Sequence, residues 1–219
     1  MYLAGNLETT FFFKMKKIIL PLLLLPLAVL ALATLYALPA VLSLLPGPRP
    51  GLTPMTIDEA VARLRASEKT GWALIEAART LVGRRMRYGR RNNWEDYHTA
   101  FSRGMGFCQQ RAFALHEILE RLGFEARVVQ AFRNRFPDGT VSGHVWVQVY
   151  DAEPAPGLPG EAAWVDIDPE WYDPITRRLT TQPLTRVSRL GGLFRIFSGW
   201  GSGVVNAHAY YREGEREAL

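Results

Sequence analysis

Residues 106–128 read GFCQQRAFALHEILERLGFEARV, and this stretch decides the fold. Its apolar residues recur at the spacing of one helix face, and Gly123 follows as a helix stop. The members of that face are Ala112, Leu115, Ile118, Leu119 and Leu122. The pattern then changes to that of a strand over residues 125–132. The stretch therefore predicts a helix that leads directly into a sheet.

Two more strands are predicted downstream. Residues 144–150 read HVWVQVY, which alternates valines with larger or polar side chains, as a half-buried strand does. Residues 164–168 read WVDID, and Pro169 ends that strand. The sequence Pro137-Asp138-Gly139 between the first two strands predicts a turn.

The region before the central helix is predicted to be helical. Thr56-Ile57-Asp58-Glu59 matches a capping box, which predicts a helix over about 57–66. A second helix is expected over about 68–82. Residues 83–93 hold five arginines and are expected to be a solvated loop, or alternatively a patch for an anionic partner. The order of elements, with one central helix between the first helices and the strands, favours an α+β fold.

The composition narrows the classes of function. The chain has 219 residues and one cysteine, which excludes an intramolecular disulfide framework and a zinc site with two or more thiolates. Residues 46–219 carry 23 basic and 20 acidic residues, a net charge of +3. This charge is too small to suggest a nucleic-acid partner.

The amino-terminal region predicts a membrane segment. Ile18–Leu45 is 28 residues long without a charged residue, and about 20 apolar residues span a bilayer. Lys14, Lys16 and Lys17 precede it, which favours a cytoplasmic amino terminus and an exported remainder. We therefore expect a single-pass membrane protein whose domain is extracytoplasmic.

A cleaved signal peptide is the alternative for this region. Ala31-Leu32-Ala33 resembles a cleavage site, although the apolar run continues well beyond it. Met15 is a more natural start than Met1. In either case the expected organisation is an anchor over residues 1–45, a Pro/Gly linker over 46–55, and a domain over 56–219.

Three side chains suggest a chemistry together. Cys108 lies at the start of the central helix, where the helix dipole favours a thiolate. His144 opens a strand, and Asp168 ends another. A thiolate attacks a carbonyl carbon, an imidazole moves the proton, and a carboxylate orients the imidazole. We therefore predict Cys108 as nucleophile, His144 as general acid and base, and Asp168 as orienting group.

The same segments resemble the transglutaminase-like superfamily. Gly106-Phe107-Cys108 with the following helix resembles that family's cysteine motif, residues 144–149 resemble its histidine strand, and residues 164–169 resemble its strand ending in Asp-Pro. The resemblance covers about residues 70–172. It implies a papain-like fold, with the central helix packed on an antiparallel sheet, and it implies no metal or organic cofactor. The family's aspartate corresponds to Asp168 rather than Asp166.

The resemblance also implies a function. Family members include enzymes that cross-link Gln to Lys, peptidases and amidases, so we expect a thiol acyl transferase or hydrolase with a protein or peptide amide donor as substrate. The alternative is a catalytically idle module that binds a protein or a cell-envelope polymer. The family's side-chain donor to the oxyanion lies upstream of the cysteine, and Asn92, Asn93 and Trp94 are candidates. Gln148 stands where the family often has an acidic residue.

Overall fold

The computed structural model describes residues 24–39, 49, 51–89, 95–151, 163–191, 200, 201 and 204. Its labelled helices are α2 (Ile57–Arg65), α3 (Gly71–Arg85), α4 (Tyr97–Arg103) and α5 (Cys108–Arg121). Its strands are β1 (Arg87–Tyr88), β2 (Met105–Gly106), β3 (Ala126–Arg135), β4 (Val141–Asp151), β5 (Ala163–Ile167), β6 (Tyr172–Asp173), β7 (Arg178–Leu179), β8 (Gln182–Pro183) and β9 (Ser188–Arg189). A mainly helical half thus precedes a mainly β half, which confirms the α+β class.

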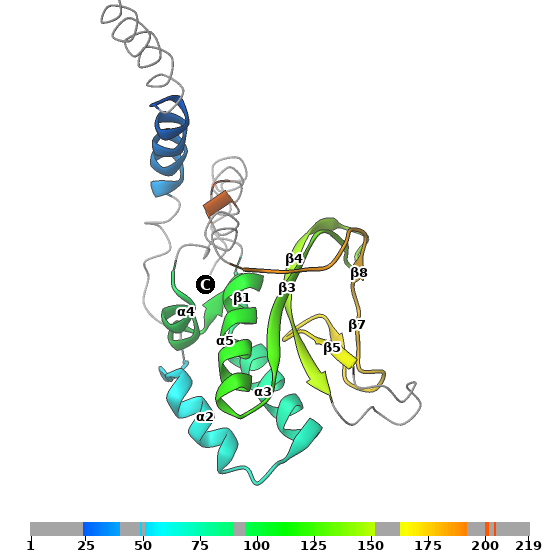
Figure 1. Cartoon of the computed structure of the whole chain (residues 1–219). Coiled ribbons are helices and arrows are strands. Elements are labelled where there is room, and N and C mark those ends of the chain that lie inside the picture. The colour runs from blue at the N-terminus through cyan, green and yellow to red at the C-terminus, as the bar shows by residue number, and fades with distance from the viewer. Residues whose placement is uncertain are drawn as a thin grey trace, which may run out of the picture.

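Helix α5 forms the centre of the domain. Helices α2, α3 and α4 pack against it on one side, and strands β3 and β4 lie on the other (Figure 1). Leu115, Ile118 and Leu119 have no exposed surface. Full burial of such side chains contributes roughly 1.5–3 kcal/mol each. The predicted apolar face of this helix is therefore the core of the domain.

The main sheet is antiparallel, with strand order β5-β4-β3-β8, and β9 also pairs with β3. Its register sets Val147 opposite Val128 on one side and Ile167 on the other. All three side chains belong to the core beneath α5. Strands β3 and β4 run longer than predicted, because the hairpin that joins them continues pairing through Asn134, Arg135, Val141 and Ser142.

The β3–β4 connection is the predicted turn. The Asp138 carboxylate accepts a hydrogen bond from the Thr140 N–H at 2.9 Å, and Gly139 adopts a φ of +84°. A left-handed residue at this position is most easily a glycine. The Pro-Asp-Gly prediction is therefore confirmed.

Helix α2 begins at the predicted capping box. The Glu59 N–H donates to the Thr56 hydroxyl at 3.1 Å, and the Glu59 carboxylate accepts from the Thr56 N–H at 2.6 Å. Helix α4 was not predicted, although its start has the signature of an N-cap. The Asp96 carboxylate there accepts from the His98 and Thr99 N–H groups.

The arginine-rich segment differs from the expected solvated loop. Helix α3 continues through Arg85, whose guanidinium is buried and donates to the carbonyl oxygens of Thr53, Phe101 and Ser102. Arg85 therefore ties residues 53–55 to the end of α4, because backbone carbonyls replace the water that a buried guanidinium loses. Arg84 and Arg87 are exposed as predicted.

The predicted membrane segment lies partly outside the described residues. Residues 24–39 are helical, and their leucines are largely exposed. No helix in the described part of the chain is long and apolar enough to cross a bilayer. Residues 18–23 and 40–45, which complete the predicted segment, are not among those described.

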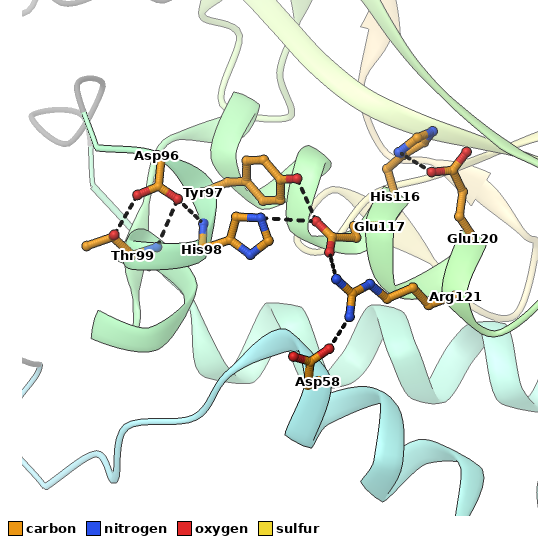
Figure 2. A network of polar contacts seen from close by, with 9 residues as sticks. All are labelled: Asp58, Asp96, Tyr97, His98, Thr99, His116, Glu117, Glu120 and Arg121. Carbon is orange, nitrogen blue, oxygen red and sulfur yellow. Dashed lines mark hydrogen bonds and ion pairs between the residues drawn. The ribbon is translucent and has the colours of Figure 1, made fainter.

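A polar cluster around Glu117 joins three helices (Figure 2). The Glu117 carboxylate on α5 accepts from the Tyr97 hydroxyl at 2.5 Å and lies 3.4 Å from His98 Nε2, both on α4. It also pairs with Arg121, which in turn reaches Asp58 on α2. The Tyr97 and His98 rings stack at 4.3 Å. His98 therefore takes part in the contacts between α4 and α5.

We expect Glu117→Gln to lower the free energy of unfolding by about 1–2 kcal/mol, because it removes the charge that three donors share. Urea unfolding of the purified protein measures the change. Glu120→Gln is the matched control on the same helix: Glu120 is 55% exposed and meets only His116 in this network. We expect it to change stability by less than about 0.5 kcal/mol. Equal effects of the two substitutions would contradict the role of the cluster.

Candidate active site

Cys108 is the first residue of α5 and is almost fully buried. The parallel pair β1–β2 leads into it, and a Cβ added to Gly106 would lie 2.6 Å from Met86 Cε and 3.3 Å from Gln110 Cβ. The glycine therefore lets β2 approach the start of the helix. The first-turn N–H groups of a helix lack intrahelical partners and favour negative charge. Cys108 is thus placed where a thiolate and an oxyanion are both favoured.

Gln110 fixes the backbone in front of the cysteine. Its side-chain oxygen accepts from the Phe107 N–H at 2.8 Å, and its amide nitrogen donates to the Glu95 carbonyl at 3.1 Å. The Gln110 side chain is buried. These two bonds hold the loop before α5 and the segment before α4 against each other, and they set the position of Cys108.

His144 lies on β4 beside a bulge in β3. It pairs with Ala131, after which the register of β3 shifts. Its Nε2 lies 3.1 Å from Asp168 Oδ2, and its ring lines the same cleft as Cys108. Because Nε2 faces the carboxylate, Nδ1 is the nitrogen left for the thiol. Phe136 covers the ring edge-on, and Trp146 stacks beneath it at 5.8 Å and 18°.

Asp168 follows β5 and is buried. Its Oδ1 accepts from the N–H groups of Glu170 at 2.8 Å and Trp171 at 2.7 Å, while Oδ2 faces His144. Both carboxylate oxygens are therefore occupied, and the carboxylate cannot rotate without losing hydrogen bonds.

Asp166 lies on the same strand but has different partners. Its Oδ1 accepts from the Trp146 indole at 2.7 Å and from the Gln148 amide at 2.8 Å. The Gln148 oxygen in turn accepts from Arg127. Asp166 thus orients the ring on which His144 stacks, and Asp168 is the carboxylate that contacts the imidazole.

The two buried charges shift each other's pKa. Burial disfavours the charged His144 ring, but the hydrogen bonds and charges of Asp168 and Cys108 outweigh it and raise the pKa of His144 from 6.5 to about 10. Burial also disfavours the Asp168 carboxylate, but the bond and charge of His144 and the two backbone N–H groups hold its pKa below 3.8. At neutral pH the site therefore holds an imidazolium next to a carboxylate.

These shifts make stability depend on pH. The protonated His144 ring contributes its full stabilisation below pH 6.5, and this contribution is lost as the pH rises towards about 10. The Asp168 carboxylate contributes above pH 3.8, and its contribution is lost in more acidic solution. The pair therefore supports the fold throughout the range between these limits.

A narrow cleft opens over the three side chains. Cys108, His144 and Asp168 line it, together with Tyr88, Arg111 and residues 169–171. Its lining includes two large aromatic side chains, Tyr88 and Trp171, and two ion pairs, Arg111–Glu170 and His144–Asp168. The described residues contain no group of three or more His, Cys, Asp or Glu side chains that could hold a metal ion. The arrangement suits proton transfer and nucleophilic attack at a carbonyl.

A family model described as the transglutaminase-like superfamily matches residues 58–169, which is 112 of the 219 residues. The chain belongs to the transglutaminase-like superfamily. Among solved structures, the chain is similar to a protein from Cytophaga hutchinsonii described as a candidate cysteine protease, with 11% identity and a TM-score of 0.40. That match covers 62% of this chain and 49% of the other, so it spans about half the length of that protein. No curated protein matches the chain.

The match to the transglutaminase-like family contains all three predicted site residues. The structure brings Cys108, His144 and Asp168 together at one cleft, whereas His116 lies elsewhere, next to Glu120. The proposed oxyanion donors, residues 92–94, lie outside the described residues.

Sequence reasoning missed four residues of the transglutaminase-like cleft, namely Tyr88, Arg111, Glu170 and Trp171. Of these four residues, only Arg111 could have been recognised from its position in the sequence. Arg111 follows Cys108 by three residues, which places both on the same helix face. Tyr88 lies in the segment that the sequence predicts to be an arginine-rich loop. Glu170 and Trp171 follow the strand that is predicted to end at Asp168, and no sequence pattern marks them.

We expect Asp168→Asn to reduce kcat on an amide substrate by roughly 10³-fold or more, because it removes the charge that supports the imidazolium. The substitution retains an oxygen for the two backbone N–H groups, so the turn should persist. NMR titration of His144 should show a midpoint near 10 in the wild type and a lower one in the variant.

Asp166→Asn is the matched control, because Asp166 lies two residues before Asp168, within β5. We expect it to leave the His144 midpoint within about one unit of the wild type. A wild-type midpoint near 6.5, or equal shifts in both variants, would show that Asp168 does not set the charge of the ring.

Proposed function

We propose that this transglutaminase-like domain is a thiol-dependent acyl transferase or hydrolase that acts on amide or peptide bonds. The observation that carries the proposal is that Cys108, the first residue of a helix, lines one cleft with His144 and Asp168, whose side chains lie 3.1 Å apart. Membership of the superfamily supports it. Its substrate would be a protein or peptide that offers a glutamine side chain or another amide.

The first half of the reaction transfers the acyl group to the enzyme. The Cys108 thiolate forms a C–S bond to the carbonyl carbon, and the oxyanion is stabilised by the free N–H at the start of α5. His144 gives its proton to the leaving nitrogen, the C–N bond breaks, and a thioester and an amine result. Asp168 keeps the ring oriented and balances its charge during this step.

The second half releases the acyl group. A water molecule or an amine attacks the thioester, His144 Nδ1 accepts its proton, and the C–S bond breaks to restore the thiolate. With water the product is a carboxylic acid, as in a peptidase or amidase. With a lysine the product is a new amide, as in protein cross-linking.

Thiol alkylation tests the activation of the cysteine without a substrate. We expect Cys108 to react with iodoacetamide well below pH 8.5, the range of an ordinary thiol, and His144→Ala to abolish this advantage. His116→Ala, a histidine on the same helix as Cys108, should react as the wild type does. Because the chain has one cysteine, the label reports on one position.

Product analysis then separates the two reactions. Glutamine-containing peptides are incubated with the wild type or Cys108→Ala, with and without a primary amine, and mass spectrometry detects hydrolysis or amine incorporation. If wild type and His144→Ala alkylate alike and no amide donor turns over, the domain is instead the idle binding module.

We also infer that residues 18–45 tether the domain to the membrane with residues 56–219 on the extracytoplasmic side. The uncharged length of the segment and the lysines before it support this orientation. An alkaline phosphatase reporter fused after Pro54 should be active, and a reporter that functions in the cytoplasm should be silent there. The opposite pattern would refute the orientation, and recovery of the reporter without the segment would indicate cleavage.

A further inference from the structure

Arg111 is a buried charge in the cleft that the proposed chemistry does not use. It lies one helical turn after Cys108 on α5, and its side chain is 6% exposed. One Nη nitrogen pairs with the carboxylate of Glu170, whose side chain is 37% exposed. Both residues line the cleft. A buried guanidinium lowers the stability of the fold unless its charge is compensated, and the Glu170 carboxylate compensates it here.

The ion pair acts on the turn that holds Asp168. Glu170 is two residues after Asp168, and its backbone N–H donates to Asp168 Oδ1 at 2.8 Å. The side chain of the same residue is held by Arg111. The ion pair therefore connects the helix that carries Cys108 to the turn that fixes the carboxylate.

Helix α3 supports this turn as well. A Cβ added to Gly83 would lie 2.4 Å from the carbonyl oxygen of Pro169, so the helix backbone packs directly on the turn. This contact limits how the turn can move towards α3, and the ion pair limits its movement away from α5. The turn is fixed through two helices that are both part of the core.

We propose that Arg111 and Glu170 are positioning residues that hold the turn of residues 168–171 at the depth where Asp168 reaches His144. Neither touches the reacting atoms in this scheme. They act through the Asp168–His144 hydrogen bond, and so on the orientation of the imidazole towards Cys108. The role rests on the proposed function for its kinetic consequences, but its effect on that hydrogen bond does not depend on any substrate.

The test uses Arg111→Met, Glu170→Gln and the reciprocal double variant Arg111→Glu with Glu170→Arg. Loss of either partner should lower kcat on an amide substrate at least tenfold and leave KM within about twofold, because orientation rather than binding is lost. The reciprocal double variant should recover a measurable part of kcat. If Arg111→Met and Glu170→Gln do not fold, Arg111→Lys and Glu170→Asp replace them in the same measurements, because these substitutions keep the charge and change only the length or shape of the side chain.

A second readout needs no turnover. The Nε2 proton of His144 in its bond to Asp168 should give a far-downfield proton NMR resonance in the wild type. We expect it to broaden or move upfield in Arg111→Met and to return in the reciprocal variant. Arg121→Met is the matched control, because it removes the ion pairs of Arg121 with Asp58 and Glu117 and should lower stability without changing this resonance.

The outcomes separate this proposal from the proposed function. An unchanged resonance in folded Arg111→Met, or a change in KM alone, would overturn the positioning role. Losses of activity that match the unfolded fraction, with no recovery in the reciprocal variant, would also overturn it. If no amide donor turns over but the resonance responds as expected, the proposed function fails and the positioning role stands.

Discussion

The burial of α5 constrains the rest of the structure. The helix is enclosed by α2, α3 and α4 on one side and by the β3–β4 hairpin on the other, and its aliphatic face is the core. A helix enclosed along its length can offer only its ends to a ligand. The end that carries unpaired N–H groups and positive dipole is the start, and Cys108 lies there. The same packing that stabilises the domain therefore determines where its nucleophile can lie.

Charge at the site is stabilised by a sequence of contacts. Cys108 and Asp168 flank the His144 ring, and Trp146 stacks beneath it under the control of Asp166. Burial alone would keep the ring neutral. The neighbouring hydrogen bonds and charges reverse that preference, so the ion pair depends on the positions of its partners. Small movements of the strands should consequently affect protonation as well as geometry.

The sequence predicted the parts of this arrangement that depend on local patterns. The capping box at Thr56, the apolar face of α5, the Pro-Asp-Gly turn and the alternation in β4 each follow from interactions between near neighbours. The choice of Asp168 over Asp166 came from the family resemblance, and the partners of the two carboxylates now give it a physical basis. Residues that depend on long-range packing were missed. Arg85 is tied to carbonyls 16 and 32 residues away, and Arg111 to a glutamate 59 residues away.

The two carboxylates at the end of β5, one in the strand and one directly after it, have a consequence for how this strand can vary. Asp166 and Asp168 are two residues apart, so they lie on the same face of the sheet. Sliding β5 by two residues along β4 would therefore bring Asp166 to the place of Asp168 and move Asp168 away from His144, while the apolar side chains stay on the core side. The turn after Asp168 opposes such a slip. The N–H groups of Glu170 and Trp171 donate to the Asp168 carboxylate, and the Pro169 carbonyl packs against Gly83, so a shifted strand would lose these contacts. Insertions or deletions are thus better tolerated in the long β4–β5 connection than between Trp164 and Trp171.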